Sequence, residues 1–223
     1  MPPSRIPLVP ALFAVLLGVL APAPAGAGAV HGRVYLTRQA AEADSNGHSS
    51  ALIALQAGIG DAVISIEPAP AKLEKRLAHK AAKVHDAPRV DQVKMKFIPR
   101  VMVVTAGDSV VFSNSDSLYH NVFSVSTARH FDLGRMPPGK IDGVRFERPG
   151  VVNLHCELHP EMMGYVVVLP TRVYTRPDSL GSFALPKLPR GHYVLHAWLP
   201  RVGDMARAFD VPRHGSTHLE LVF

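Results

Sequence analysis

The stretch VVNLHCELHPEMMGYVVVL, residues 151–169, consists of two apolar, β-branched runs separated by a short polar loop. The runs at 151–156 and 164–169 have the composition of strands, so a hairpin-like pair is expected here. The loop contains Cys156, His159 and Met162, which offer a thiolate, an imidazole and a thioether. This soft ligand set suits copper, above all Cu(I), while the imidazole also serves Cu(II). The sequence therefore predicts a copper site between two strands.

Short segments of strand composition, separated by Gly, Pro, Asn and Asp, continue on both sides of this pair. They are expected at 31–36, 62–67, 95–97, 101–105, 109–113, 121–124, 143–147, 181–185, 191–198, 206–211 and 218–222. Many short strands with such turns favour an all-β sandwich. The exception is 71–86, where Leu73 and Leu77 share one face of a basic, amphipathic helix.

A type 1 copper site needs two His nitrogens and one Cys sulfur near a plane, with a weak axial Met. The loop supplies only one His, and His120, at the start of an apolar strand, is the best candidate for the second. His155 should point away from the metal, because successive strand residues face opposite sides. Met163 remains an alternative to Met162 as the axial ligand.

Several motifs resemble the small cupredoxins, or blue copper proteins, in their amicyanin-like and plastocyanin-like forms. They are Lys94-Met-Lys-Phe, Val103-Val-Thr-Ala-Gly-Asp-Ser-Val, His120-Asn-Val, and Cys156-x-x-His-Pro-x-Met162-x-Gly-Tyr-Val-Val-Val. The short Cys-x-x-His-x-x-Met spacing is the amicyanin-like form. This resemblance covers about residues 92–170, roughly a third of the chain.

The resemblance implies a Greek-key β-sandwich that holds one type 1 copper ion near one end. His120, Cys156 and His159 would be the strong ligands and Met162 the axial ligand. Asn121 would steady the ligand loop by hydrogen bonds. The implied role is outer-sphere electron transfer to a redox partner protein, with an apolar docking patch expected at Leu158, Pro160, Met136 and Pro137.

The N-terminus predicts export. Arg5, the apolar run Leu8–Leu20 and the small residues of 21–29 are typical of a secretory signal peptide over 1–29. The apolar run is short for a membrane span, which needs about 20 residues, so no membrane association is expected beyond the signal. A periplasmic or otherwise exported protein follows, and no nucleic-acid-binding motif accompanies the formal charge of +6.

The C-terminal part has a resemblance of its own. DSLGSFALPKLPRGHYVL, residues 178–195, is similar to carboxypeptidase-regulatory-like, or transthyretin-like, β modules, with a Gly-x-Phe turn followed by Leu-Pro-x-Gly-x-Tyr. The expected organisation is an N-terminal β segment and basic helical linker at 30–91, a cupredoxin domain at 92–170 and a β module at 171–223. Residues 30–70 could complete this second sandwich. Alternatively, the 62–67 strand belongs to the cupredoxin sheet.

Two functions share these ligands: a one-electron carrier, and a copper chaperone or storage protein without an electron-transfer role. An enzyme is not expected, because the chain has no His-x-His pair for a trinuclear cluster and only one Cys. Serine-elbow, Walker and zinc-protease motifs are also lacking. The remaining histidines show no recognisable ligand spacing; they include 31, 48, 79, 85, 192, 196, 214 and 218.

Overall fold

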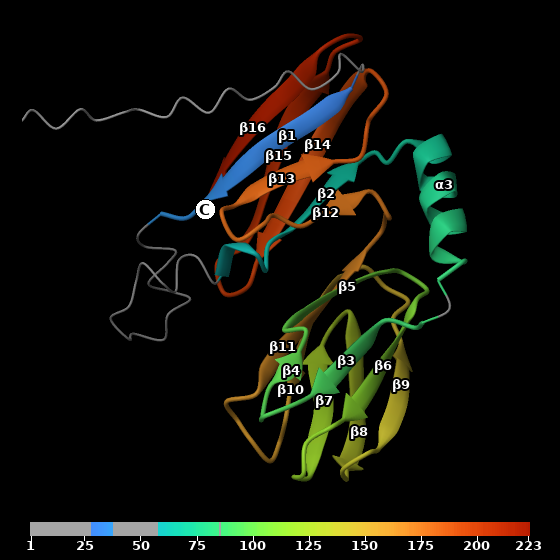
Figure 1. Ribbon diagram of the computed structural model, residues 1–223, viewed down its shortest axis with the longest axis vertical. Coiled ribbons are helices and arrows are strands. Elements are labelled where there is room, and N and C mark those ends of the chain that lie inside the picture. Colours follow the sequence, from blue (N-terminus) through green and yellow to red (C-terminus); the bar gives the residue numbers. More distant parts are fainter. Residues whose placement is uncertain (1–27, 38–57, 85) are drawn as a thin grey trace, which may run out of the picture.

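The chain folds into two β-sandwiches, one above the other in Figure 1, with a single described helix on their flank. This computed structural model describes residues 28–37, 58–84 and 86–223. The predicted signal peptide therefore lies almost entirely outside the described residues. Strands dominate the described part, which confirms the predicted all-β class.

The lower sandwich consists of a five-stranded sheet, β5-β11-β10-β7-β8, and a four-stranded sheet, β4-β3-β6-β9. Its strands are β3 (Arg89–Gln92), β4 (Phe97–Ile98), β5 (Val101–Thr105), β6 (Ser109–Asn114), β7 (His120–Ser126), β8 (Arg129–Met136), β9 (Ile141–Arg145), β10 (Gly150–His155) and β11 (Met163–Leu169). Strands β10 and β11 are antiparallel, and β11 is parallel to β5. The predicted hairpin-like pair at 151–169 is therefore present at the centre of the larger sheet.

The upper sandwich consists of the sheets β13-β1-β16 and β12-β2-β14-β15. Its strands are β1 (Ala29–Tyr35), β2 (Val63–Glu67), β12 (Tyr174–Thr175), β13 (Ser182–Leu185), β14 (Gly191–Leu199), β15 (Gly203–Val211) and β16 (Ser216–Val222). Strand β1 is bonded to β13 and β16, and β2 to β12 and β14. Strands from the N-terminal and C-terminal parts of the chain are therefore hydrogen-bonded to each other in one sandwich. Strand β2 belongs to this sandwich and forms no ladder with the lower sheets.

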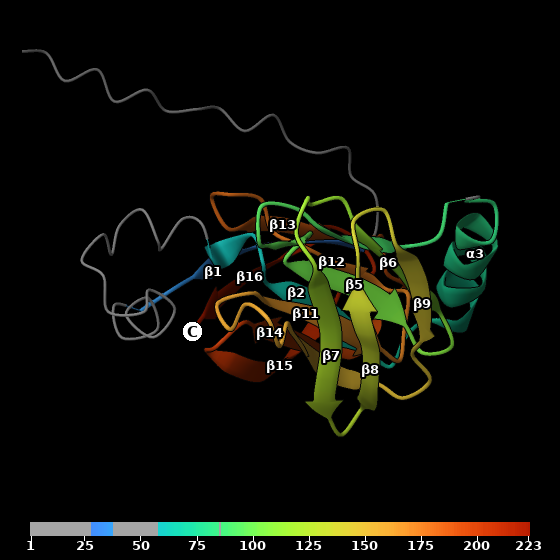
Figure 2. The same ribbon diagram turned by 90° about the horizontal axis from the view of Figure 1, so that it is seen from below.

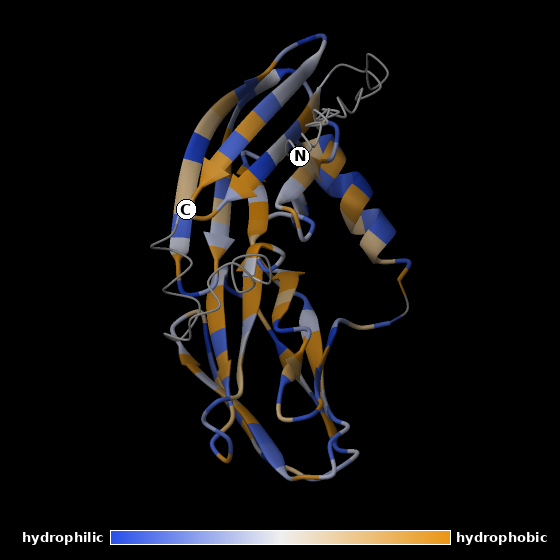
Figure 3. Cartoon of the chain, turned by 60° about the vertical axis from the view of Figure 1, so that its left-hand side comes forward, coloured by the Kyte–Doolittle hydropathy of each residue, from blue (hydrophilic) through white to orange (hydrophobic). Residues whose placement is uncertain are grey.

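Alternation of side chains builds the core of the upper sandwich. Along β14, every second residue from Tyr193 to Leu199 is buried, and Figure 3 shows hydrophobic and hydrophilic residues alternating along these strands. The buried face packs around Val30, Ile64, Leu195 and Leu221. Period-two patterning with one buried face is what an antiparallel, half-buried strand requires.

An apolar contact joins the two sandwiches. Val101, Tyr165 and Val167 of the lower sandwich share a cluster with Val63 and Trp198 of the upper one. The Tyr165 and Trp198 rings meet edge to face, with centroids 5.3 Å apart, a preferred geometry for aromatic pairs. This contact covers one face of the β5–β11 pair, which in an isolated sandwich would be exposed to water.

Charged groups hold the edge of this contact. Arg172 donates two hydrogen bonds to Asp108, at 2.7 and 3.1 Å. Asp61 accepts hydrogen bonds from Arg100 and Arg176. Hydrogen bonds from Arg172 and from the Thr105 N–H lower the pKa of Asp108, although burial opposes the shift. Both clusters connect residues of the upper and lower sandwiches.

The predicted helix is present but shorter than expected: α3 runs from Ala71 to Ala81. It lies on the flank of the molecule in Figures 1 and 2. Leu73 is buried, while the Glu74 carboxylate accepts hydrogen bonds from the Thr171 hydroxyl and the Arg172 N–H. Among the described helices, none is both long and apolar enough to cross a membrane.

One predicted strand is wrong. Residues 95–97 do not form it, because Lys94 and Met95 have positive φ angles of 51° and 55° and make a turn instead. The strand there is β4, at 97–98. Non-glycine residues in this region need local support, and the Asp116 carboxylate provides it by accepting hydrogen bonds from the N–H groups of both residues, each at 2.8 Å.

Candidate metal centre

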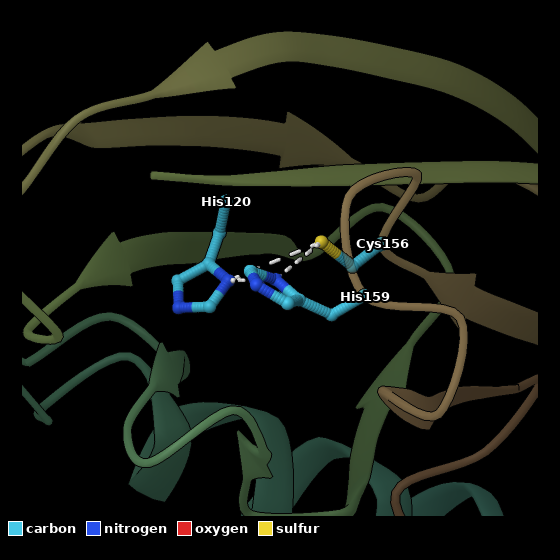
Figure 4. Close-up of side chains that lie close together, drawn as sticks. All are labelled: His120, Cys156 and His159. Carbon is cyan, nitrogen blue, oxygen red and sulfur yellow. Dashed lines mark hydrogen bonds between the residues drawn. The ribbon is translucent and has the colours of Figure 1, made fainter. Parts of the chain in front are cut away.

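The loop between β10 and β11 brings two of the predicted site residues together. Cys156, buried and directly after β10, has its Sγ 3.7 Å from Nδ1 of His159. A hydrogen bond from the Met162 N–H to the His159 carbonyl, 2.9 Å long, closes the loop. Figure 4 shows the Cys156 and His159 side chains converging from this loop. The short spacing therefore folds into a compact turn.

His120 reaches the same point from a different strand. As the first residue of β7 it is fully buried, and its Nδ1 lies 3.0 Å from Nδ1 of His159 and 3.9 Å from Sγ of Cys156. Within the described residues, these three form the only group of three or more His, Cys, Asp or Glu whose ligand atoms all lie within 4.8 Å of one another. The fold thus brings a strand histidine to the loop, as predicted.

The imidazole nitrogen of His120 that faces away from Cys156 and His159 is hydrogen-bonded to a carboxylate. Nε2 of His120 lies 2.9 Å from Oδ2 of Asp116. Hydrogen bonds from the Met95 N–H, above all, and from Lys94 and His120 lower the pKa of Asp116, against a smaller effect of burial. An ionised Asp116 accepts a hydrogen bond from the Nε2–H group of His120, which leaves the Nδ1 lone pair facing the other two groups. Imidazole ligands of metals are oriented in this way.

The donor set fits copper. Two imidazole nitrogens and one thiolate converge, and a carboxylate supports one imidazole from behind. This His₂Cys set is the one that blue copper sites use, completed by a long axial bond to a weaker ligand such as Met. No charged oxygen ligand of the kind that Mg²⁺ or Ca²⁺ prefers belongs to the group that the structure brings together.

Asn121 links the strand to the loop. Its side-chain oxygen accepts a hydrogen bond of 3.3 Å from the Glu157 N–H, and its amide donates to Asp132 at 2.7 Å. Asn121 is also buried. The hydrogen-bonding role implied by the family resemblance is therefore present in the structure: Asn121 anchors the residue that follows Cys156.

The two methionines that end the loop differ in surroundings. Met162 is buried in the apolar cluster that also contains Cys156. Met163 begins β11, and its sulfur accepts a hydrogen bond of 3.6 Å from Arg201 of the upper sandwich. The ring of His155, the other near neighbour, packs against the Phe123 ring at a tilt of 37°, with centroids 5.6 Å apart. Met163 and His155 therefore have partners outside the His120–Cys156–His159 group, namely Arg201 and Phe123.

Part of the predicted apolar patch is wrong. Met136 is fully buried because it faces the core beside Gln92, whose side-chain amide lies 3.4 Å from its sulfur. Leu158 is exposed, as a docking surface requires, and sequence reasoning missed Leu118 and Tyr119, which are 47% and 56% exposed just before His120. Asp116 was also missed; its position four residues before His120 was the available signal.

Comparisons with known proteins agree with this site. Residues 84–169 match the family model of copper-binding proteins, plastocyanin/azurin family. Amicyanin-alpha of Methylorubrum extorquens is 32% identical over 99 residues, 38% of this chain and 77% of the relative. Amicyanin of Paracoccus denitrificans is 33% identical, over 40% of this chain and 70% of the relative. A solved amicyanin variant in the reduced state is 35% identical, over 40% of this chain and 88% of that chain, with a TM-score of 0.35.

The chain therefore belongs to the plastocyanin/azurin family of copper-binding proteins, and copper is its cofactor. Both the matched residues and the His–Cys–His group lie in the lower sandwich. The likeness of the upper sandwich to carboxypeptidase-regulatory-like modules stays a prediction.

Proposed function

We propose that this protein is an exported, type 1 copper electron carrier, with the metal held by His120, Cys156, His159 and Met162. The observation that carries the proposal is the convergence of Nδ1 of His120, Sγ of Cys156 and Nδ1 of His159 within 4.8 Å. Copper in such a site supplies a one-electron couple between Cu(II) and Cu(I). Membership of a family that includes the amicyanins supports this role.

A rigid surrounding supports electron transfer. The ligand groups come from β7 and from the loop between β10 and β11, and hydrogen bonds accepted by Asp116 and Asn121 restrain them. Little movement between the two oxidation states keeps the cost of reorganisation low. His120 and Cys156 are buried, which excludes water from the metal.

Electrons would leave through His159, the one imidazole of the group that is partly exposed. Exposed apolar side chains lie beside both histidines in sequence: Leu118 and Tyr119 before His120, and Leu158 before His159. A redox partner protein would dock here, because close, water-poor contact favours transfer from the imidazole edge. The compartment we propose is the periplasm, as the secretory character of residues 1–29 favours.

The test is an absorption and electron spin resonance spectrum of the copper-loaded protein, with reversible one-electron cycling. A type 1 site should give an intense thiolate-to-copper band at about 600 nm. Cys156→Ala should abolish that band because it removes the thiolate, while His130→Ala, a strand histidine away from the site, should keep it.

A blue band that survives Cys156→Ala would refute the ligand assignment. Copper bound without a blue band, and passed rapidly to a competing apoprotein, would instead favour a chaperone or storage role.

A further inference from the structure

The outer face of the β13-β1-β16 sheet carries two histidines from near opposite ends of the chain. His31 of β1 and His218 of β16 are exposed, whereas their neighbours Gly32 and Leu219 are buried. We propose that His31 and His218 form a second metal site, which binds Cu(II) at the surface of the upper sandwich. This site shares no residue with the His120–Cys156–His159 group.

The strand register places the two imidazoles together. Strands β1 and β16 are parallel, and His31 is the direct partner of His218. Neighbouring strands lie about 4.8 Å apart, and side chains of partnered residues on one face stand side by side. Figure 1 shows β1 and β16 running along each other at this edge of the molecule. The spacing suits two nitrogen ligands of one ion.

Both imidazoles are available for binding. Among the described residues, neither makes an ion pair or a side-chain hydrogen bond. The partner of His31 on the other side is Ala184, which is too small to cover it. The next pair on the same exposed face, Arg33 and Glu220, carries opposite charges that offset each other beside the site.

The chemistry selects Cu(II). Two exposed imidazoles leave the remaining positions to water, and Cu(II) accepts such a tetragonal set of nitrogen and oxygen ligands. In the Irving–Williams order, Cu(II) also binds such sites more tightly than Ni(II) or Zn(II). No thiolate lies on this face, so the bound ion would lack the blue band. Spectroscopy therefore separates the two sites.

Binding would also link distant parts of the chain. The ion would clip β1 to β16, which come together only in the folded protein. A ligand that binds the folded but not the unfolded chain raises the apparent stability. Cu(II) added beyond the first equivalent should therefore raise the melting temperature of the protein, an effect that needs no electron-transfer assay.

The experiment adds Cu(II) to untagged protein whose first copper equivalent is already bound. The expected result is a second equivalent with a nitrogen-coordinated, non-blue spin-resonance signal. His31→Ala and His218→Ala should each weaken this binding by ~10-fold to 100-fold or more. Loss of a group that only supports a ligand already has an effect of that size, and here the ligand itself is lost. His130→Ala is the matched control, because His130 is an exposed strand histidine whose partner is Val125.

Three results would overturn the pair. Second-site binding that is lost with His31→Ala but kept with His218→Ala would mean that His31 acts without its neighbour. Equal weakening by His130→Ala would mean diffuse surface binding. Loss of second-site binding with His192→Ala, but with neither His31→Ala nor His218→Ala, would place the second site at His192 and Asp210. These two residues lie in contact on another sheet. A missing blue band, with the second signal intact, would count against the proposed function and not against this site.

Discussion

Asp116 connects a backbone turn to a ligand-bearing imidazole. Its two carboxylate oxygens accept hydrogen bonds from the N–H groups of Lys94 and Met95, and Oδ2 also meets Nε2 of His120. One side chain therefore stabilises a turn in the smaller sheet and orients a residue of the larger one. Its effect on the metal is indirect, through the position and tautomer of His120.

Asp116→Asn should weaken copper binding by ~10-fold to 100-fold, the usual effect of removing a group that orients a ligand. The neutral amide cannot accept the hydrogen bond from Nε2–H of His120 and both backbone hydrogen bonds as strongly as a carboxylate. Competition with a chelator measures this affinity. Asp142→Asn, at a partly exposed site on β9, should leave it unchanged, and equal affinities for both variants would contradict the role of Asp116.

Met162→Leu should keep copper but raise the reduction potential, because the thioether that donates to Cu(II) is lost and the axial ligand tunes the potential. Met163→Leu is the matched control and should leave the potential unchanged, since the Met163 sulfur faces Arg201. Voltammetry of both variants decides the axial ligand. A shift in Met163→Leu alone would exchange the two assignments.

At the scale of elements, β1 depends on close approach at Gly32. A Cβ atom at this position would lie 2.3 Å from the Leu219 carbonyl oxygen and 2.4 Å from the Phe183 ring. Because Gly32 has no side chain, the backbone of β16 and the Phe183 ring of β13 can both approach β1 closely. Gly143 of β9 differs, because the nearest atom to its Cβ would be 3.8 Å away.

Gly32→Ala should destabilise the protein by about 1–3 kcal/mol or more, the cost of overpacking a closed site. Gly143→Ala should change stability by less than about 1 kcal/mol, since its site is open and exposed. Thermal or urea unfolding gives both values. A Gly32→Ala protein as stable as Gly143→Ala would contradict the tight packing of β1.

At the scale of the whole molecule, the two sandwiches share an interface with an apolar centre and charged edges. Tyr165 and Trp198 meet at the centre, and Arg172 and Asp108 at one edge. The pKa of Asp108 is lowered in the folded protein. Asp108 therefore contributes stability above the pKa of an unfolded Asp, about 4, and this contribution is lost as the pH falls through the lower, folded pKa.

Asp108→Asn should lower the unfolding free energy at pH 7 by about 1–3 kcal/mol, as expected for hydrogen bonds to a charged group. Below pH ~4 the difference from the unaltered protein should shrink, because Asp108 is then increasingly protonated. Unfolding curves between pH 3 and 7 test both points. Asp142→Asn, whose partner Lys140 is exposed and 3.7 Å away, should cost less than about 1 kcal/mol, and equal losses would remove the special role of the interface.

Most strands were predictable because each is a local pattern of alternating or β-branched residues. The segments 101–105, 109–113 and 164–169 correspond closely to β5, β6 and β11. The turn at Lys94 and Met95 was not predictable, because these residues adopt positive φ only with the distant Asp116 bonded to them. The end of α3 at Ala81 was also missed, although the apolar spacing continued beyond it.

The sequence by itself determined the all-β class, the copper-binding family and the loop that holds Cys156 and His159, because those signals lie within short stretches of chain. Only the tertiary structure decided what distant segments do together. It brought Asp116 to the backbone of Lys94 and Met95, buried Met136, and paired β1 with β16 so that His31 stands beside His218. These contacts join residues far apart in the chain, and their formation depends on how whole sheets pack, which no local pattern records.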